Sequence, residues 1–218
     1  MTTNWSCFLF DLDGTIIDSA PGITASLAWT LERLGRPVPS HTELLAYVGP
    51  PILDSFRDLA GMTVDEAQHA LEVYRPHYLQ TGIFNSSVYP GVAQLLKRVQ
   101  ESAIPISLAT SKPELPATTA LDYYGLAQHF TVITGASQDE VRSRKADVVA
   151  EALRRLAAIG VDTSNPVMVG DREHDVHGAA EHGVPTIFVE WGYGTVAEQA
   201  GTIGVAATAE ELGALLLG

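Results

Sequence analysis

The sequence predicts an α/β fold in which a Rossmann-like parallel sheet carries helices on both faces and an all-helical unit is inserted after the first strand. Three observations indicate this class. Short apolar runs rich in β-branched residues recur along the chain, helical periodicity separates them, and one long stretch shows helical periodicity alone. Strands that alternate with helices favour a parallel sheet, because right-handed crossovers place the helices on its two faces.

Five apolar segments are expected to form the sheet. Each is short and is bounded by glycine, proline or polar residues, as buried parallel strands are. They are residues 8–10, 104–109, 130–133, 166–169 and 186–189. Helical spacing of apolar residues predicts the intervening helices at 92–101, 115–124, 145–159, 175–182 and 210–217.

Residues 18–86 break this alternation, because they contain no strand-like run. Their helical patterns, at 24–34, 42–48, 52–59 and 64–80, end at segments that contain glycine or proline. We therefore expect a helical cap domain over 18–86 and a catalytic core formed by 1–17 and 87–218. Linkers near residues 18–21 and 85–87 would join the two domains.

The bulk composition excludes several classes of partner. The 218-residue chain has 13 Lys+Arg and 26 Asp+Glu, a net charge of −13, which repels nucleic acids and anionic membranes. No apolar run reaches the roughly 18 residues of a membrane span. Residues 1–5 lack the basic and apolar regions of a secretory signal. A cytoplasmic protein without nucleic-acid or membrane partners is expected, and either a monomer or a homodimer is compatible with the sequence.

Two carboxylates end the first apolar segment. Asp11 and Asp13 are spaced i, i+2 and are followed directly by Gly14 and Thr15. Open parallel sheets bind ligands in the crevice beyond the carboxyl ends of their strands. Acidic groups placed there are costly unless a cation or an acid/base role explains them. This position is therefore the first candidate for a functional site.

Further polar residues are expected at the same edge of the sheet. Thr110, Ser111 and Lys112 follow the second strand, Lys145 begins the helix after the third, and Asp171 and Asp175 follow the fourth. Lysine is scarce, since the chain has only Lys97, Lys112 and Lys145. Two of the three lysines thus fall at candidate site positions.

These groups suit phosphoryl transfer through an aspartyl-phosphate. Asp11 is placed to attack phosphorus. Asp13 is placed to protonate the leaving oxygen and then to take a proton from the hydrolytic water. Thr110 offers a hydroxyl to a phosphoryl oxygen, and Lys145 offers a positive charge to the phosphate and the nucleophile.

The clustering of acids implies a hard divalent cation. Mg²⁺ fits, held by Asp11 and Asp171 together with substrate and water oxygens. Asp175 lies four residues after Asp171, so both side chains face the same way if a helix begins there.

The ordered pattern Asp-x-Asp-Gly-Thr, Thr/Ser, Lys and Gly-Asp-x-x-x-Asp resembles the haloacid dehalogenase superfamily of phosphohydrolases. Residues 48–51, 126–130 and 191–194 are most similar to its phosphoglycolate phosphatase-like branch. The resemblance implies that the helical insertion is a mobile cap that closes over the site.

The same resemblance implies roles for individual residues. Asp11 would be the nucleophile and Asp13 the acid/base, with the Asp13 backbone carbonyl on the metal. Asp171 would bind the metal, and Asp175 would bind it directly or support its ligands. Gly14 and Thr15 would form the turn whose N–H groups hold the phosphoryl group.

Contacts to the rest of the substrate are expected from Gly49, Ser111 and Lys112. Pro50 and Pro51 stiffen the loop after Gly49 and lead into a helix whose N-terminus favours an anion. Such a loop suggests a small leaving group, and a 2-phosphoglycolate-like metabolite is the favoured substrate.

Several alternatives remain open at this point. A 5'-nucleotidase-like phosphatase is nearly as compatible, and a sugar-phosphate mutase is disfavoured because Arg57 is the nearest cation after Gly49. Dehalogenases lack the second aspartate, and the phosphonate-cleaving relatives need a cap lysine, which residues 18–86 do not contain. Outside the enzyme class, a phospho-accepting signalling domain or a metabolite-sensing relative is the competing interpretation.

Minor features have structural interpretations. Trp191 and Tyr193 are expected mainly to pack, and His174 and His177 to be exposed. Arg142 and Arg144 are expected to be solvated or paired with Asp139 and Glu140.

Overall fold

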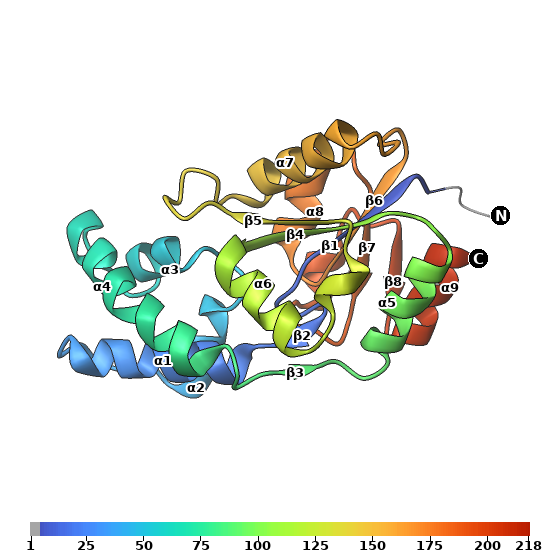
Figure 1. Ribbon diagram of the computed structural model, residues 1–218. Coiled ribbons are helices and arrows are strands. Elements are labelled where there is room, and N and C mark those ends of the chain that lie inside the picture. The colour runs from blue at the N-terminus through green and yellow to red at the C-terminus, as the bar shows by residue number, and fades with distance from the viewer. Residues whose placement is uncertain (1–4) are drawn as a thin grey trace.

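The computed structural model describes residues 5–218, so the part of the signal-sequence prediction that concerns residues 1–4 lies outside it (Figure 1). Its main sheet has six parallel strands in the order β5-β4-β1-β6-β7-β8. The strands are β1 (Cys7–Phe10), β4 (Ile106–Pro113), β5 (Val132–Ala136), β6 (Pro166–Gly170), β7 (Thr186–Val189) and β8 (Gly204–Ala206).

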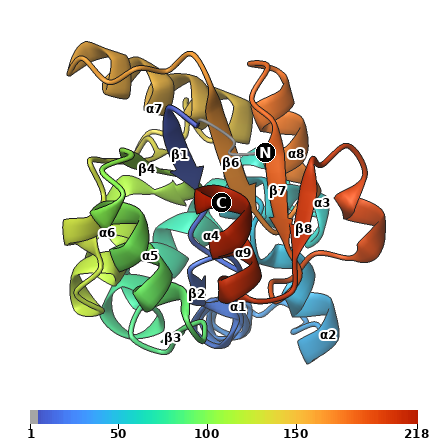
Figure 2. The same ribbon diagram turned by 90° about the vertical axis from the view of Figure 1, so that its right-hand side faces the viewer.

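Helices cover both faces of this sheet (Figure 2). One face packs against α7 (Lys145–Ala158) and α8 (Glu173–Ala180), and the other packs against α5 (Val92–Glu101), α6 (Glu114–Tyr123) and α9 (Ala209–Leu217). Successive residues of β1 serve the two faces in turn: Cys7 and Leu9 join the α7 and α8 side, whereas Phe8 and Phe10 join the other. The predicted fold class is confirmed.

The helical insertion comprises α1 (Ala20–Arg33), α2 (His41–Leu44), a 3₁₀ turn (Leu45–Tyr47), α3 (Ile52–Asp58) and α4 (Val64–His77). A π-helical turn (Tyr78–Gly82) extends α4. These helices gather at the end of the molecule opposite the two termini (Figure 1). Reciprocal side-chain caps start α2 (Ser40 with Glu43) and α4 (Thr63 with Glu66), which fixes where each helix begins.

The insertion is joined to the core by a short ribbon. β2 (Ile17–Asp18) pairs antiparallel with β3 (Ser87–Val88), so the chain enters and leaves the cap side by side. The division of the chain at residues 18 and 86 stays a prediction.

Two predictions about the strands were wrong: where the second strand ends, and how many strands the sheet has. The second strand runs to Pro113, so Thr110, Ser111 and Lys112 lie within β4 and not after it. The sixth strand, β8, was missed because it has only three residues, of which one is glycine and only Ala206 is buried. Among residues 5–218, no helix combines the length and apolarity that a membrane crossing requires.

Candidate active site

The turn after β1 brings both leading aspartates to the carboxyl edge of the sheet. The Asp11 amide donates to the Val169 carbonyl of β6 at 2.9 Å, which continues the ladder to the last residue before the turn. Asp11 and Asp13 are 4% and 6% exposed. Gly14 has φ +87, and a Cβ there would lie 2.3 Å from the Asp171 carboxylate. The turn therefore needs glycine for its conformation and for its close approach to a neighbouring acid.

Lys145 connects the first strand with the last acidic motif. It begins α7, and its Nζ lies 2.7 Å from both Asp11 Oδ1 and Asp175 Oδ1. Nζ also donates to the Ala109 carbonyl at 3.0 Å. Burial opposes the lysine charge, but Asp11 and Asp175 outweigh it and raise the pKa of Lys145 above its ordinary value. The lysine is therefore a permanent positive charge inside the site.

The pKa of Asp11 is raised to about 6 in spite of this lysine. Burial is the main cause. Lys145 opposes the shift, but Asp175 and Asp13 repel a negative charge on Asp11. One lysine therefore does not compensate all the acids of the site.

Asp171 and Asp175 are held by hydrogen bonds from neighbouring loops. Asp171 Oδ1 accepts from Thr15 Oγ1 at 2.9 Å, and its Oδ2 accepts from the Tyr193 amide at 2.8 Å. Asp175 Oδ2 accepts from the amides of Asp171 and Arg172 at 3.1 and 3.0 Å, at the start of α8. Burial, followed by the charges of Asp175 and Asp11, raises the pKa of Asp171 well above its ordinary value.

Asp11, Asp171 and Asp175 form a carboxylate cluster that fits a metal ion. One oxygen from each lies within 4.8 Å of the others, and all three residues are buried. Asp11 Oδ1 and Asp175 Oδ1 have no well-directed hydrogen bond within residues 5–218, although both are close to Lys145. Buried carboxylate oxygens in this number are the donor set that hard divalent cations such as Mg²⁺ prefer.

The Asp13 side chain lies apart from this cluster. Lys112 Nζ lies 2.9 and 3.0 Å from its two oxygens, and the pair is buried. The same Nζ lies 4.8 Å from the ring centroid of Tyr78, a residue of the helical insertion. Thr110 is also buried, and its Oγ1 accepts from the Lys112 amide at 3.2 Å. The structure thus separates a three-carboxylate cluster from an aspartate–lysine pair.

Gly49 lines the same cavity as Asp13 and Lys112 and lies next to Arg172. Arg172 Nη1 donates to the Val48 carbonyl at 2.7 Å, and Nε pairs with Glu198 at 2.9 Å. Gly49 has φ +107, and a Cβ there would lie 3.3 Å from Arg172 Nη1. Arg172, the residue that follows Asp171, therefore ties the loop of the insertion to the start of α8. Sequence reasoning gave Arg172 no role, although it lies inside the Gly-Asp-x-x-x-Asp motif.

Two minor expectations need correction. Tyr193 does more than pack, because its hydroxyl donates to Asp18 Oδ1 at 2.8 Å and its amide holds Asp171. Arg142 pairs with Glu114, not with Asp139 or Glu140. Arg144 is exposed, as expected, and its ion pair is with Glu181.

Comparison with known proteins identifies the family of this chain. The family described as "Haloacid dehalogenase-like hydrolase" matches residues 8–189. The chain belongs to this family, and the resemblance predicted from the motifs is confirmed.

Individual relatives carry different names. "Tyrosine-protein kinase PtkA" of Mycobacterium tuberculosis is 41% identical over 85% of this chain, and the match spans 62% of that protein. "5'-nucleotidase" of Pseudomonas aeruginosa is 34% identical over 86% of this chain and 83% of its own length. "Phosphoglycolate phosphatase" of Pseudomonas savastanoi pv. phaseolicola is 33% identical over 85% of this chain and 69% of its own.

A solved structure described as a predicted phosphatase from Clostridium acetobutylicum superposes with a TM-score of 0.91 at 33% identity. The match covers 97% of this chain and 98% of that one.

Proposed function

We propose that this chain is a Mg²⁺-dependent phosphatase that hydrolyses a small phosphomonoester, with 2-phosphoglycolate-like metabolites favoured, through an aspartyl-phosphate on Asp11. One observation carries the proposal. Asp11 is buried at the carboxyl end of β1, 2.7 Å from Lys145 and within a cluster that includes Asp171 and Asp175. In a chain of the haloacid dehalogenase-like hydrolase family, this arrangement supports a nucleophile beside a metal site.

The metal would be held by Asp11 and Asp171, with Asp175 beside them and the Asp13 backbone carbonyl as a further ligand. When bound, Mg²⁺ supplies charge stabilisation to the phosphoryl oxygens and lowers the repulsion between these acids. Lys145 supplies a positive charge to these acids whether or not the metal is bound. Its ion pair with Asp11 favours the ionised carboxylate and orients it for attack, and its ion pair with Asp175 helps to hold the lysine in place.

The reaction proceeds in two displacements. An Asp11 oxygen forms a bond to phosphorus while the bond from phosphorus to the leaving oxygen breaks, and Asp13 donates a proton to that oxygen. Asp13 then removes a proton from water, whose oxygen attacks phosphorus. The bond to Asp11 breaks, and inorganic phosphate and the ionised Asp11 are released. Lys112 holds both Asp13 oxygens and so fixes the acid/base in place.

The remaining predicted residues would bind the phosphoryl group and close the site. Thr110 donates to a phosphoryl oxygen, while Ser111 and Gly49 line the approach. Gly14 and Thr15 shape the turn beside the phosphoryl group, but their amides do not hold it as expected, because they donate to the Ile17 and Leu12 carbonyls at 2.9 and 3.3 Å. The insertion acts as a cap over residues 18–86 that excludes bulk water when it is closed.

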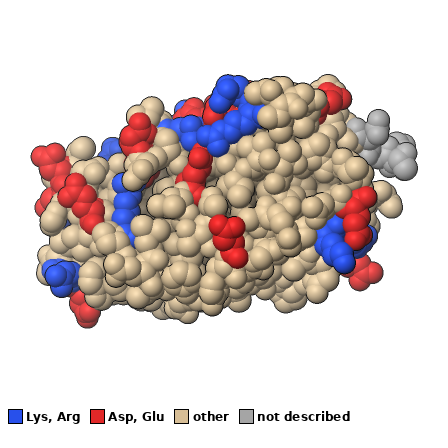
Figure 3. Space-filling model, viewed as in Figure 1, with Lys and Arg blue, Asp and Glu red and all other residues tan. Residues whose placement is uncertain are grey.

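We also propose that the enzyme acts on free metabolites in the cytoplasm. The net charge of −13 supports the absence of nucleic-acid partners. On the face in Figure 3, basic side chains stand beside acidic ones and form no broad basic patch.

The test is phosphate release from a panel of phosphomonoesters that includes 2-phosphoglycolate, nucleoside monophosphates and hexose phosphates, with Mg²⁺ and with EDTA. Mg²⁺-dependent release that Asp11→Asn abolishes is expected. Because one relative is named a tyrosine-protein kinase, a further reaction contains ATP and a tyrosine peptide. Transfer to the peptide without ester hydrolysis would overturn the proposal.

A further inference from the structure

The loop that follows β7, residues 190–195, is packed directly against Asp171, and we call it the β7 loop. The Tyr193 amide donates to Asp171 Oδ2 at 2.8 Å. A Cβ at Gly192 would lie 2.4 Å from the Asp171 side chain, and a Cβ at Gly194 would lie 1.9 Å from the Asp171 carbonyl oxygen. Because groups packed this closely move together, a displacement of Asp171 displaces the β7 loop.

The Tyr193 side chain reaches from this loop to the start of the helical insertion. Its hydroxyl accepts from the amides of Ser19 and Ala20 at 2.8 and 2.9 Å, and it donates to Asp18 Oδ1 at 2.8 Å. Burial raises the pKa of the Tyr193 hydroxyl, so the hydroxyl keeps the proton that it donates. Tyr193 thus serves amides at the start of α1 that have no acceptor within the helix.

Ser19 stands at the N-cap position of α1 but does not cap the helix. A serine in this position ordinarily accepts from an amide of the first turn. Here the side chain makes no capping hydrogen bond, and Ser19 Oγ is buried without a hydrogen-bond partner within residues 5–218. The start of α1 therefore depends on Tyr193, a residue that lies 174 positions further along the chain.

A movement at the start of α1 is carried into the rest of the insertion. The apolar face of α1 is buried in the core of the insertion. The helix also packs on the segment that leaves the insertion, because a Cβ at Gly22 would lie 1.9 Å from the Gly82 carbonyl oxygen. The ring of Trp191 in the β7 loop lies 6.4 Å from that of Tyr89, which follows β3. The β7 loop therefore adjoins both crossings of the chain between core and insertion.

We propose that Tyr193 is a positioning residue that ties the docking of the helical insertion to the occupancy of the metal site at Asp171. With a divalent cation bound, Asp171 and the β7 loop are held in place, and the capped start of α1 holds the insertion against the core. This inference rests on the metal site of the proposed function and not on the reaction itself.

Charge repulsion supplies the difference between the two states. Asp11, Asp171 and Asp175 are buried together, and one oxygen of each lies within 4.8 Å of the others. Within residues 5–218, the ion pairs of Lys145 are with Asp11 and Asp175, so Asp171 is the acid that depends most on a cation. A divalent cation bound by these oxygens fixes Asp171 against the repulsion. Because coupling is reciprocal, docking of α1 favours the cation as much as the cation favours docking.

The test is hydrogen exchange of the Ser19 amide, followed by NMR on the full chain in EDTA and in saturating Mg²⁺. Ser19 is the reporter because its amide donates to Tyr193, whereas the Ala20 amide also lies 3.3 Å from Asp18 Oδ1. In the wild-type protein, Mg²⁺ is expected to slow this exchange about 5-fold or more. Tyr193→Phe keeps the ring and the amide but removes the hydroxyl. It is expected to speed the exchange about 2- to 10-fold and to abolish the Mg²⁺ effect.

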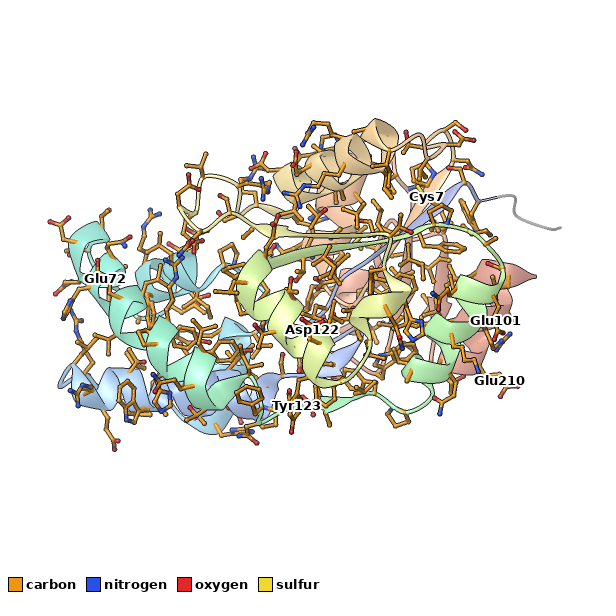
Figure 4. All side chains as sticks on the ribbon, in the orientation of Figure 1. Cys7, Glu72, Glu101, Asp122, Tyr123 and Glu210 are labelled. Atoms are coloured by element: carbon orange, nitrogen blue, oxygen red, sulfur yellow. The ribbon has the colours of Figure 1, made fainter. Side chains whose placement is uncertain are left out.

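Tyr124→Phe is the matched control, because the Tyr124 hydroxyl also joins the core to the insertion, at the other crossing. Tyr124 follows Tyr123 at the end of α6 (Figure 4), and its hydroxyl donates to the Ser86 carbonyl and lies 2.9 Å from Ser86 Oγ. Both Tyr124 and Tyr193 are half-buried. If Tyr193 acted only as a helix cap, both variants would keep the Mg²⁺ effect on Ser19. Only Tyr193→Phe is expected to lose it.

Two results would overturn the inference: an Mg²⁺ effect of the same size in Tyr193→Phe, or no Mg²⁺ effect on Ser19 in the wild-type protein. If Tyr193→Phe did not fold, the wild-type protein alone would decide, with the amides of α5 as an internal reference far from the insertion (Figure 1). Equal slowing of Ser19 and α5 would contradict coupling through Tyr193.

Failure of the proposed function is recognised separately. Calorimetric Mg²⁺ binding and slowed Ser19 exchange, without phosphate release from any ester, would overturn the phosphatase and support the coupling. Phosphate release that depends on Mg²⁺, without slowed Ser19 exchange, would overturn the coupling alone. No calorimetric binding of Mg²⁺ by the folded protein would overturn both.

Discussion

Replacing Lys145 by methionine should destabilise the protein strongly, and more at high pH than at low pH. The lysine is 7% exposed and lies 2.7 Å from two carboxylates. Removing one partner of such a buried pair costs about 3–5 kcal/mol, because the remaining charge is left uncompensated. At about 2–4 °C per kcal/mol for a chain of this size, the melting temperature should fall by roughly 6–20 °C.

The pH dependence follows from the direction of the Asp11 shift. The pKa of Asp11 rises from 3.8 to about 6 on folding, so the folded state binds more protons between these values. Stability therefore falls as the pH rises through this window. Without Lys145 the folded-state pKa should rise further, which extends the loss to higher pH. At pH 5 the acids of the variant can be protonated, and much of the destabilisation should disappear.

The assay is thermal unfolding at pH 5 and pH 8, each in EDTA and in Mg²⁺. Lys97→Met is the control, because the Lys97 side chain is 70% exposed and its contact with Glu101 is 4.0 Å long. Mg²⁺ should restore part of the stability of Lys145→Met at pH 8. An equal loss at both pH values, or no loss at pH 8 in EDTA, would refute the view that Lys145 compensates the acid cluster.

Three further predictions concern the same site. Arg172→Ala removes the hydrogen bond to the Val48 carbonyl. Proteolysis within the cap should therefore become faster, and kcat/KM should fall about 10- to 100-fold. Unchanged proteolysis would contradict the view that Arg172 ties the cap to the core. Asp11→Asn should abolish turnover. It should not lower the melting temperature in EDTA, because it removes a buried charge. Substantial residual turnover would exclude Asp11 as the nucleophile. Gly14→Ala places a Cβ 2.3 Å from the Asp171 carboxylate. The increase in melting temperature that Mg²⁺ produces should therefore become smaller. An unchanged increase would show that the turn does not shape the metal site.

The sheet and its acidic edge were predictable because their signals are local. β1 and β7 are fully buried four-residue runs, and β6 is nearly as buried, so apolar composition alone reports them. The acids that follow β1 and β6 stand out against such runs. Parallel topology then brings distant strand ends to one edge, which is why Asp11 and Asp171 could be placed together before any coordinates.

The missed features depend on tertiary contacts that no local pattern encodes. Lys112 was expected at the site, but its pairing with Asp13 was not, because the irregular end of β4 carries it there. Tyr74 and Tyr78 read as ordinary members of an apolar helix face. Only the packing of the helical insertion against the core places them around a cavity beside the site. Arg172 was given no role because its acceptor, the Val48 carbonyl, lies 124 residues away in the sequence.

The charge balance of the site connects the metal to substrate binding. When Asp11, Asp171 and Asp175 are ionised, three negative charges face the single positive charge of Lys145, which leaves −2. The Asp13–Lys112 pair beside them is neutral. A phosphomonoester dianion would therefore enter a negative site on a protein that already carries −13. A divalent cation brings the cluster to neutrality. Affinity for the phosphoryl group should consequently depend on Mg²⁺ before any bond is broken, and Asp11→Asn should bind phosphate esters more tightly in EDTA than the wild-type protein does.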